Sequence, residues 1–267
     1  MNNMLTKVLA GLGVAAGLMG SAHAAIVTQW QATTAGTWLP GSYAAGVTAS
    51  LADTKLSWGT DIGNGQSSLT IGNPAANQVV NTYIGGGLPP PVFTVPGSTV
   101  THRNFPITNS PMTGATIRDT LSLTALNPAG PGPGALPPIN FDIAFVETPN
   151  SGTCAATSPP GNPCNDIFVL KGGFLNQSFS YDSQTYFVNI FPTSGGVLSV
   201  LQDTACAAAG QANGCIGFTT PEGQETTLAF GYTVSTEELR VPEPSSFALI
   251  GLALLCAGGV GRRLRQS

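Results

Sequence analysis

Charge is what this sequence has least of. Asp, Glu, Lys and Arg make up 8% of its 267 residues, against about 25% in an ordinary soluble domain. Between Ala25 and Pro244, thirteen acidic residues outnumber five basic ones (Lys55, Arg103, Arg118, Lys171, Arg240), for a net charge of −8. This balance argues against nucleic acid and anionic membrane surfaces as partners, because no basic patch exists to displace counterions from phosphates. A surface of Thr, Ser, Asn and Gln is compatible with uncharged, hydroxyl-rich polysaccharide.

Histidine is almost absent as well. The chain has two, His23 and His102, so no H-E-x-x-H pair or histidine-rich site can form. No G-x-S-x-G nucleophile motif is present either. A glycosidase needs two carboxylates across a cleft, and Asp142 with Glu147 on one segment matches no better than any other acidic pair. We therefore expect no catalytic residue, no metal and no cofactor.

Two further patterns give weak binding signals. Residues 61–65, Asp-Ile-Gly-Asn-Gly, resemble part of a calcium loop but lack its later ligands, so a plain Asn-Gly turn is favoured. Trp30, Trp38 and Trp58 could form a platform that stacks on sugars. Tryptophans in a β-rich protein are more often core residues.

The few cysteines bracket short loops. Cys154 and Cys164 enclose a Pro/Gly/Ser-rich stretch, Cys206 and Cys215 enclose an Ala/Gly-rich stretch, and Cys256 stands alone. Four cysteines allow three pairings, and we favour the two local ones, which would form in an oxidising compartment. Loops of about ten residues gain under about 3 kcal/mol each from such a bond. A zinc site is disfavoured, because no Cys-x-x-Cys pair or neighbouring histidine is present.

The N-terminus has the three parts of a secretory signal peptide. Lys7 supplies a positive charge, Val8 to Gly20 is apolar, and Ala22-His23-Ala24 fits the small-x-small cleavage pattern. We expect residues 1–24 to be a signal peptide that is cut between Ala24 and Ala25, which removes His23.

The C-terminus has the parts of a short membrane segment. Residues 245–260 carry no charge and would span about 24 Å as a helix, less than the ~30 Å hydrocarbon core. The basic stub 262–267, with Arg262, Arg263 and Arg265, should stay cytoplasmic and leave the bulk of the chain outside. We expect a transmembrane helix over 245–261.

This tail resembles the PEP-CTERM sorting tail. The resemblance is carried by Pro242-Glu243-Pro244, the single hydrophobic helix and the basic stub, in that order over 242–267. It implies an exported bacterial protein that a membrane-embedded exosortase recognises and processes, and that the helix anchors transiently. An ordinary permanent anchor is the alternative interpretation.

Between the termini the pattern is β throughout. Apolar residues alternate over 139–145 and over 228–234, which places one apolar stripe on one sheet face. Gly/Pro-rich stretches punctuate further strand-like segments, and the one weak helical candidate is 204–212. We predict an all-β ectodomain over 25–240, an antiparallel β-sandwich or jelly-roll-like fold. Residues 127–138 are interpreted as a long surface loop, with an interdomain linker as the alternative.

A second resemblance lies inside the domain. Thr101-His102-Arg103-Asn104 is similar to the T-H-x-N signature of a family of PEP-CTERM proteins, and Leu56-Ser57-Trp58-Gly59 and Gln66-Ser67-Ser68-Leu69 resemble stretches that precede it. The resemblance implies a β-rich extracellular domain without an established activity.

The T-H-x-N residues allow two interpretations. On a strand, His102 and Asn104 share one face while Thr101 and Arg103 share the other, and Pro106 ends the pairing. The favoured interpretation is a structural strand end, in which Asn104 caps the turn and His102 satisfies buried carbonyls. The alternative is a binding site for a sugar or ion centred on His102.

Two functions follow from these observations. The first is a non-enzymatic surface or exopolysaccharide-matrix protein of a Gram-negative cell, processed at its tail. The second is a carbohydrate-binding module, and a secreted hydrolase is a distant third. Exposed tryptophans on one face would favour sugar binding, whereas a pocket that joins His102 to acidic residues would favour an enzyme.

Overall fold

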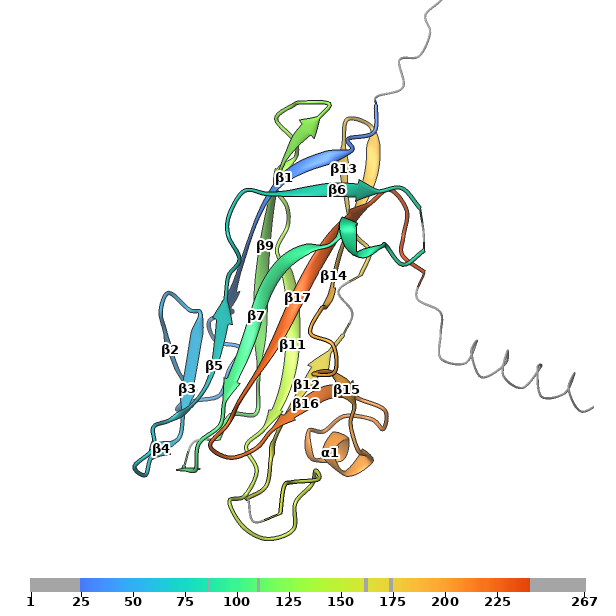
Figure 1. The fold of residues 1–267 in the computed structure, drawn as a ribbon. Helices are drawn as coiled ribbons and strands as arrows, with labels where there is room; N and C mark the ends of the chain where they lie inside the picture. Colours follow the sequence, from blue (N-terminus) through green and yellow to red (C-terminus); the bar gives the residue numbers. More distant parts are fainter. Residues whose placement is uncertain (1–24, 86, 110, 161–162, 173–174, 241–267) are drawn as a thin grey trace, which may run out of the picture.

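The computed structural model describes residues 25–85, 87–109, 111–160, 163–172 and 175–240, and about half of these residues lie in strands (Figure 1). The predicted signal peptide with Ala24, the Pro242-Glu243-Pro244 motif, the tail helix with Cys256, and the basic stub lie outside the described residues. Within them, no helix is long and apolar enough to cross a membrane.

Fifteen of the described strands form one hydrogen-bonded sheet. Its main path runs in the order β15 (Ser199–Val200), β16 (Ile216–Thr220), β12 (Asp166–Lys171), β11 (Ile139–Val146), β9 (Gly114–Asn127), β1 (Gln29–Trp38), β6 (Gln78–Tyr83), β17 (Glu225–Ser235), β7 (Val95–Arg103), β5 (Ser67–Gly72), β3 (Lys55–Trp58) and β2 (Thr48–Ser50). The strands off this path are β10 (Gly134–Ala135) beside β9, β14 (Gln184–Pro192) beside β17, and β13 (Gln177–Tyr181) beside β14.

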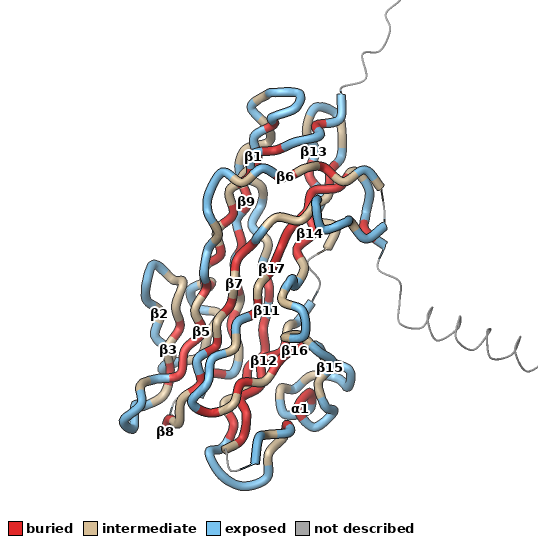
Figure 2. Tube along the Cα trace, in the orientation of Figure 1, coloured by how far each residue is buried: buried red, intermediate tan, exposed pale blue. Residues whose placement is uncertain are grey.

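The path folds over, so that its two halves face each other around one core. One continuous apolar cluster contains Trp30 and Leu123 from the half that ends in β15, and Leu69 and Leu228 from the half that ends in β2. Figure 2 shows the buried positions running along the lengths of these strands. The prediction of a β-rich, antiparallel domain is confirmed.

The halves are joined at a point that no sequence pattern indicates. Strand β6 pairs antiparallel with β1 and, through Thr82 and Tyr83, parallel with the end of β17. This parallel contact joins the two facing layers into one continuous sheet. The sheet is open, because its end strands β15 and β2 do not pair with each other among the described residues. The sequence analysis missed β6 because Gln78-Val79-Val80-Asn81-Thr82-Tyr83 lacks a clear apolar alternation.

The alternation that predicted the long strands has a direct structural cause. In β9 every second residue from Ala115 to Ala125 is buried, while the residues between them face outward. In β17 the alternation gives way after Leu228, and residues 230–235 are all buried. That half of the strand lies between β7 and β14 and is buried on both faces, so the polar Thr233 and Ser235 are enclosed there together with the apolar residues.

Short segments complete the fold. The loop that follows Asn127 returns to β9, where Gly134 of β10 pairs with Leu123. The small pair β4 (Thr60–Asp61) and β8 (Ile107–Thr108) extends one end of the molecule. Helix α1 (Asp203–Ala208) occupies the weak helical candidate and covers a second small apolar cluster that includes Ile167 and Ala205. A 3-10 turn, η1, spans Pro91–Phe93.

Both predicted local disulfides are present. Cys154 and Cys164 are joined with their Cα atoms 5.1 Å apart, and Cys206 and Cys215 are joined at 5.7 Å. The first bond closes the loop between β11 and β12. The second ties α1 to the start of β16. Each therefore fixes a connection rather than a strand pair.

Candidate functional site

Thr101, His102 and Arg103 are the last three residues of β7, and Asn104 is the first residue after the strand. His102 and Asn104 are fully buried, whereas Arg103 is exposed and Thr101 is partly exposed, which is the alternation expected of a strand. Asn104 closes the turn between β16 and β17. Its backbone N–H donates to Gln224 O (3.0 Å), its carbonyl accepts from Gly223 N (3.0 Å), and its Nδ2 donates to Thr220 O (2.9 Å).

His102 does not have the role that the sequence analysis favoured. Neither ring nitrogen has a hydrogen-bond partner among the described residues, so the expectation that it satisfies buried carbonyls is wrong. Its ring stacks on Trp58 (5.9 Å between centroids, 9° between planes) and meets the edge of Phe145 (4.9 Å). These two rings hold the imidazole so that Nε2 lies 3.7 Å from Asp166 Oδ2.

Asp166 belongs to a cluster of three buried or half-buried carboxylates. Glu147 follows β11, Asp166 begins β12, and Glu222 lies in the turn before β17; one carboxylate oxygen from each lies within 4.8 Å of the others. Asp166 is 1% exposed and Glu222 is 7% exposed. The indole Nε1–H of Trp58 donates to Glu147 Oε2 (2.5 Å). The site therefore joins residues from both halves of the sheet.

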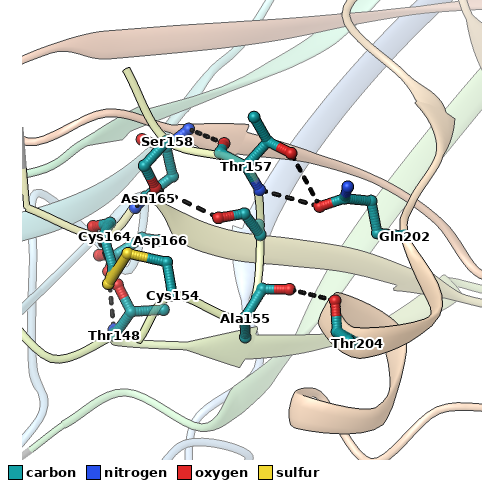
Figure 3. Close-up of a disulfide and its surroundings, with 11 residues drawn as sticks. Thr148, Cys154, Ala155, Thr157, Ser158, Cys164, Asn165, Asp166, Gln202 and Thr204 are labelled. Atoms are coloured by element: carbon teal, nitrogen blue, oxygen red, sulfur yellow. Dashed lines mark hydrogen bonds between the residues drawn. A yellow bond between two sulfur atoms is a disulfide. The ribbon is translucent and has the colours of Figure 1, made fainter. Parts of the chain in front are cut away.

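The Cys154–Cys164 disulfide lies beside Thr148 and Asp166 (Figure 3). Thr148 donates from its backbone N–H to Asp166 Oδ1 (2.8 Å) and from its hydroxyl to Cys164 O (3.0 Å). Because Cys164 lies two residues before Asp166 and Thr148 follows Glu147, the bond and the threonine fix both carboxylates at the ends of one loop.

Burial controls the charge of the cluster. It lowers the pKa of His102 to about 3 and raises the pKa of Glu147 to about 7. Burial, reinforced by the neighbouring Glu147 charge, raises the pKa of Asp166 to about 9. Burial also raises the pKa of Glu222, against a hydrogen bond from Asn104. His102 and Asp166 are thus both neutral near pH 7, and their 3.7 Å approach is not an ion pair although it lies within ion-pair distance.

The stretches upstream of T-H-x-N converge on the same place. Strands β3, β5 and β7 are neighbours, with Leu56 opposite Leu69 and Leu69 opposite His102. Gly59 follows Trp58 with a φ of 78°, and a Cβ there would overlap Ile107, so the backbone requires glycine at this position. Ser67 exchanges hydrogen bonds with the backbone of Phe105 (3.0 and 3.1 Å). These short motifs therefore build one wall of the site.

Other candidates lie elsewhere. Trp30, Trp38 and Trp58 are all fully buried, so the hypothesis of an exposed sugar-stacking platform is wrong and their expected role as core residues is confirmed. Asp142 is exposed and accepts a hydrogen bond from Thr116 Oγ1 (2.6 Å), so it forms no pair with Glu147.

On the outer face, Thr101 pairs with Thr227 (2.9 Å) and Arg103 with Glu225 (3.1 Å). Asp61 accepts from Gly63 N and Gly65 N in an exposed turn, and these two hydrogen bonds lower its pKa.

Sequence reasoning missed Asp166 and Glu222. A signal for Asp166 was available, because an ionisable residue at the head of the buried apolar run Ile167-Phe168-Val169 needs a partner. Glu222 lies in an ordinary Pro-Glu-Gly turn and carries no local signal.

The comparison with protein families gives one match. The PEP-CTERM protein-sorting motif is found at residues 240–265. The chain carries a PEP-CTERM sorting signal. This signal implies a secreted protein that is exported and processed by an exosortase at its C-terminus. No curated protein matches the chain.

Proposed function

We propose that this PEP-CTERM protein is a non-enzymatic component of the cell surface or exopolysaccharide matrix of a Gram-negative bacterium. The observation that carries the proposal is the sorting motif placed directly after a rigid β-domain. Leu239 is 4% exposed and is held by Asn176, which accepts from its N–H (2.7 Å) and donates to its carbonyl (3.1 Å). The motif match begins at residue 240. The tail is anchored transiently and removed, and the ectodomain remains outside.

The burial of the polar residues supports a role without catalysis. His102, the histidine that remains once the predicted leader is removed, is fully enclosed, and its nearest carboxylate is equally buried. A general acid or base must reach its substrate within hydrogen-bond distance. The polar cluster is built into the core and offers no open cleft for a polymer.

The outer face supports association with uncharged polymers. The exposed and half-exposed positions of β1 and β9 lie opposite one another as Gln31 with Thr124, Thr33 with Ser122, and Thr37 with Arg118. This row of hydroxyls and amides favours carbohydrate binding as the second candidate, on a flat polar face rather than on stacked tryptophans.

Processing is tested by one pair of matched variants. In cells with an exosortase, the secreted wild-type protein should end within or before the Pro242–Pro244 region. Glu243→Gln should accumulate uncut in the membrane fraction, whereas Glu238→Gln, an exposed acid just before the motif, should be processed normally. Fractionation and mass spectrometry of both ends measure this. An intact arginine-rich C-terminus on extracellular wild-type protein contradicts the proposal.

Polymer association is tested separately on the secreted protein. Replacing Thr37 and Thr124 by valine removes two hydroxyls of this face and keeps the β-branched shape. Retention by the organism's own exopolysaccharide should fall with an unchanged melting temperature if the β1–β9 face binds glycan. Equal retention of variant and wild type rules this face out and leaves the surface role without a glycan contact there.

A further inference from the structure

We propose that Glu147, Asp166 and Glu222, with His102 and Asn104, bind one hard divalent cation of the Ca²⁺ or Mn²⁺ type. The cation would clamp the two halves of the sheet together at the end of the domain where β7 ends and β17 begins. Four observations support this site.

The first is uncompensated acidity. Within the described residues, the charge pairs closer than 4.0 Å are His102–Asp166 and Arg103–Glu225, so no lysine or arginine neutralises the three carboxylates. Buried acids are normally paired or coordinate a metal. Arg103 follows His102 in the chain, but its side chain is exposed on the outer face and pairs with Glu225 instead of the three carboxylates.

The second is a concentration of unpaired polar atoms around one point. His102 Nδ1 and Nε2 and Asn104 Oδ1 are buried and have no hydrogen-bond partner in the described chain. The buried carboxyl groups have one another or the Asn104 amide beside them, because Glu147 faces Asp166 and Glu222 faces Asn104. A buried polar group without a partner costs about 1–3 kcal/mol. His102 is fully buried with Nε2 directed at Asp166, so this observation is independent of the acidic cluster itself.

The third is geometry. The gap of 3.7 Å between His102 Nε2 and Asp166 Oδ2 is too long for a hydrogen bond. It suits two ligands of one ion, because metal–ligand bonds are about 2.0–2.6 Å long. The carboxylate oxygens, all within 4.8 Å of one another, fit the same sphere. Carboxylates and an amide oxygen suit Ca²⁺ and Mn²⁺, and the single imidazole nitrogen favours Mn²⁺ over Ca²⁺, which takes oxygen ligands.

The fourth is the way in which the fold holds these ligands. They come from β7, from the loop between β11 and β12, and from the turn before β17, so one ion contacts both halves of the sheet. Trp58 orients Glu147, Thr148 orients Asp166, and the disulfide fixes the loop between them. Metal sites depend on such supporting hydrogen bonds. Glu147 also lines a surface pocket of about 360 Å³ with Met112 and Phe145, so the cluster lies close to that pocket.

The experiment begins with the full-length protein, treated with a chelator and then dialysed. Metal content is measured by mass spectrometry, and melting temperature is measured with CaCl₂, MnCl₂, MgCl₂ or ZnCl₂ added singly. We expect one bound ion per chain, and a melting temperature about 5–10 °C higher at one hundred times the Kd of Ca²⁺ or Mn²⁺. Mg²⁺ and Zn²⁺ should have smaller effects.

Isosteric variants locate the ion. Asp166→Asn and Glu222→Gln should each lose the bound ion and the cation-induced rise. Asp61→Asn, which alters the exposed calcium-loop-like turn, and Asp142→Asn, which alters an exposed acid on β11, should keep both.

Each result bears on the proposal. No retained ion and no rise with any of the four salts overturns it from the wild type alone. An equal rise in Asp166→Asn and Glu222→Gln overturns it, because the ion then binds elsewhere, and loss in Asp61→Asn alone assigns the ion to the turn. If Asp166→Asn does not fold, the proposal is tested by the wild-type titration together with the cation-induced rise in melting temperature of Glu222→Gln.

Discussion

Two fully buried tryptophans lie in opposite environments in this molecule. Trp30 is surrounded by Phe179, Tyr181 and Tyr186, with centroid distances of 5.1–5.7 Å, and its Nε1–H donates to Thr82 Oγ1 (2.9 Å). Trp58 lies against His102 and Phe145, and its Nε1–H donates to Glu147.

The two surroundings differ in whether the buried polar atoms have hydrogen-bond partners. Around Trp30 the polar ends are paired: Thr82 donates onward to Val27 O, and Tyr186 accepts from Val27 N. This end is an ordinary aromatic core, and such edge-to-face contacts add to its apolar burial. Around Trp58 several polar atoms are unpaired. The side chains around Trp58 are held in fixed positions, and burying their unpaired polar atoms costs free energy that a bound ligand would offset.

The largest effect is expected at the aromatic end. Trp30→Ala should lower the free energy of unfolding by about 3–5 kcal/mol, because it removes a fully buried indole and leaves a cavity. Urea denaturation measures this. Val79→Ala, at a 51% exposed position on the neighbouring β6, is the control and should change stability by less than about 0.5 kcal/mol. A Trp30→Ala loss below about 1 kcal/mol would show that this cluster is not a packed core.

The two disulfides allow a matched test of position. Their sequence separations are 10 and 9, so the chain-entropy model gives each pair of Cys→Ser changes the same cost, up to about 3 kcal/mol. Only the loss of Cys154–Cys164 should also weaken cation binding, because that bond fixes the loop carrying Glu147 and Asp166. Denaturation and cation titration of both double variants measure this. Equal cation affinity in the two would remove the positional role of the first bond.

A smaller effect is expected at His102. In the protein without a cation, His102→Leu should change the free energy of unfolding by no more than about 1 kcal/mol, because it keeps the volume and removes two nitrogens that lack partners. It should reduce the cation-induced rise in melting temperature. Melts with chelator and with Mn²⁺ or Ca²⁺ separate the two effects. A loss of about 2–3 kcal/mol with chelator would restore the interpretation of His102 as a hydrogen-bonded strand end.

The smallest effect is expected within the main core, at Asp119. Burial raises the pKa of Asp119, which accepts a hydrogen bond from Thr34 Oγ1 (2.7 Å) and faces Tyr232. A raised pKa in the folded state means that the contribution of this group to stability is present below its ordinary pKa and is lost as pH rises through the raised value. Asp119→Asn removes this dependence.

The measurement is the difference in unfolding free energy between Asp119→Asn and wild type from about pH 3.5 to about pH 8. The variant should become more stable relative to wild type as pH rises, and the other acids cancel because both proteins contain them. A difference independent of pH contradicts the assigned cause.

The strands were predictable where apolar residues alternate along the chain. Residues 139–145 and 228–234 alternate because their apolar side chains line the main core, although residues 230–235 are buried on both faces. The short cysteine loops pair locally because the chain between them is short. The shorter strands β6, β13 and β16 carry little alternation, and their pairing is set by strands far away in sequence.

The site was half visible in the sequence. Thr101-His102-Arg103-Asn104 and Trp58-Gly59 were singled out, and their strand positions follow from the period of two. Glu147 was considered only with Asp142, five residues away, whereas its partners are Asp166 and Glu222. These residues come together because the two halves of the sheet pack face to face, and no local sequence pattern indicates that packing.

By itself, the sequence determined the C-terminal sorting signal, the scarcity of charge, the β-rich class and the local disulfides, because each depends on residues near one another in the chain. The tertiary structure alone decided that three acids from separate segments meet beside His102, and that the tryptophans are core residues. The physical reason is that strand pairing and layer packing bring together residues that are far apart in the chain, such as His102 and Glu222, which are 120 positions apart. The energy of burying a charge is defined only after that packing is in place.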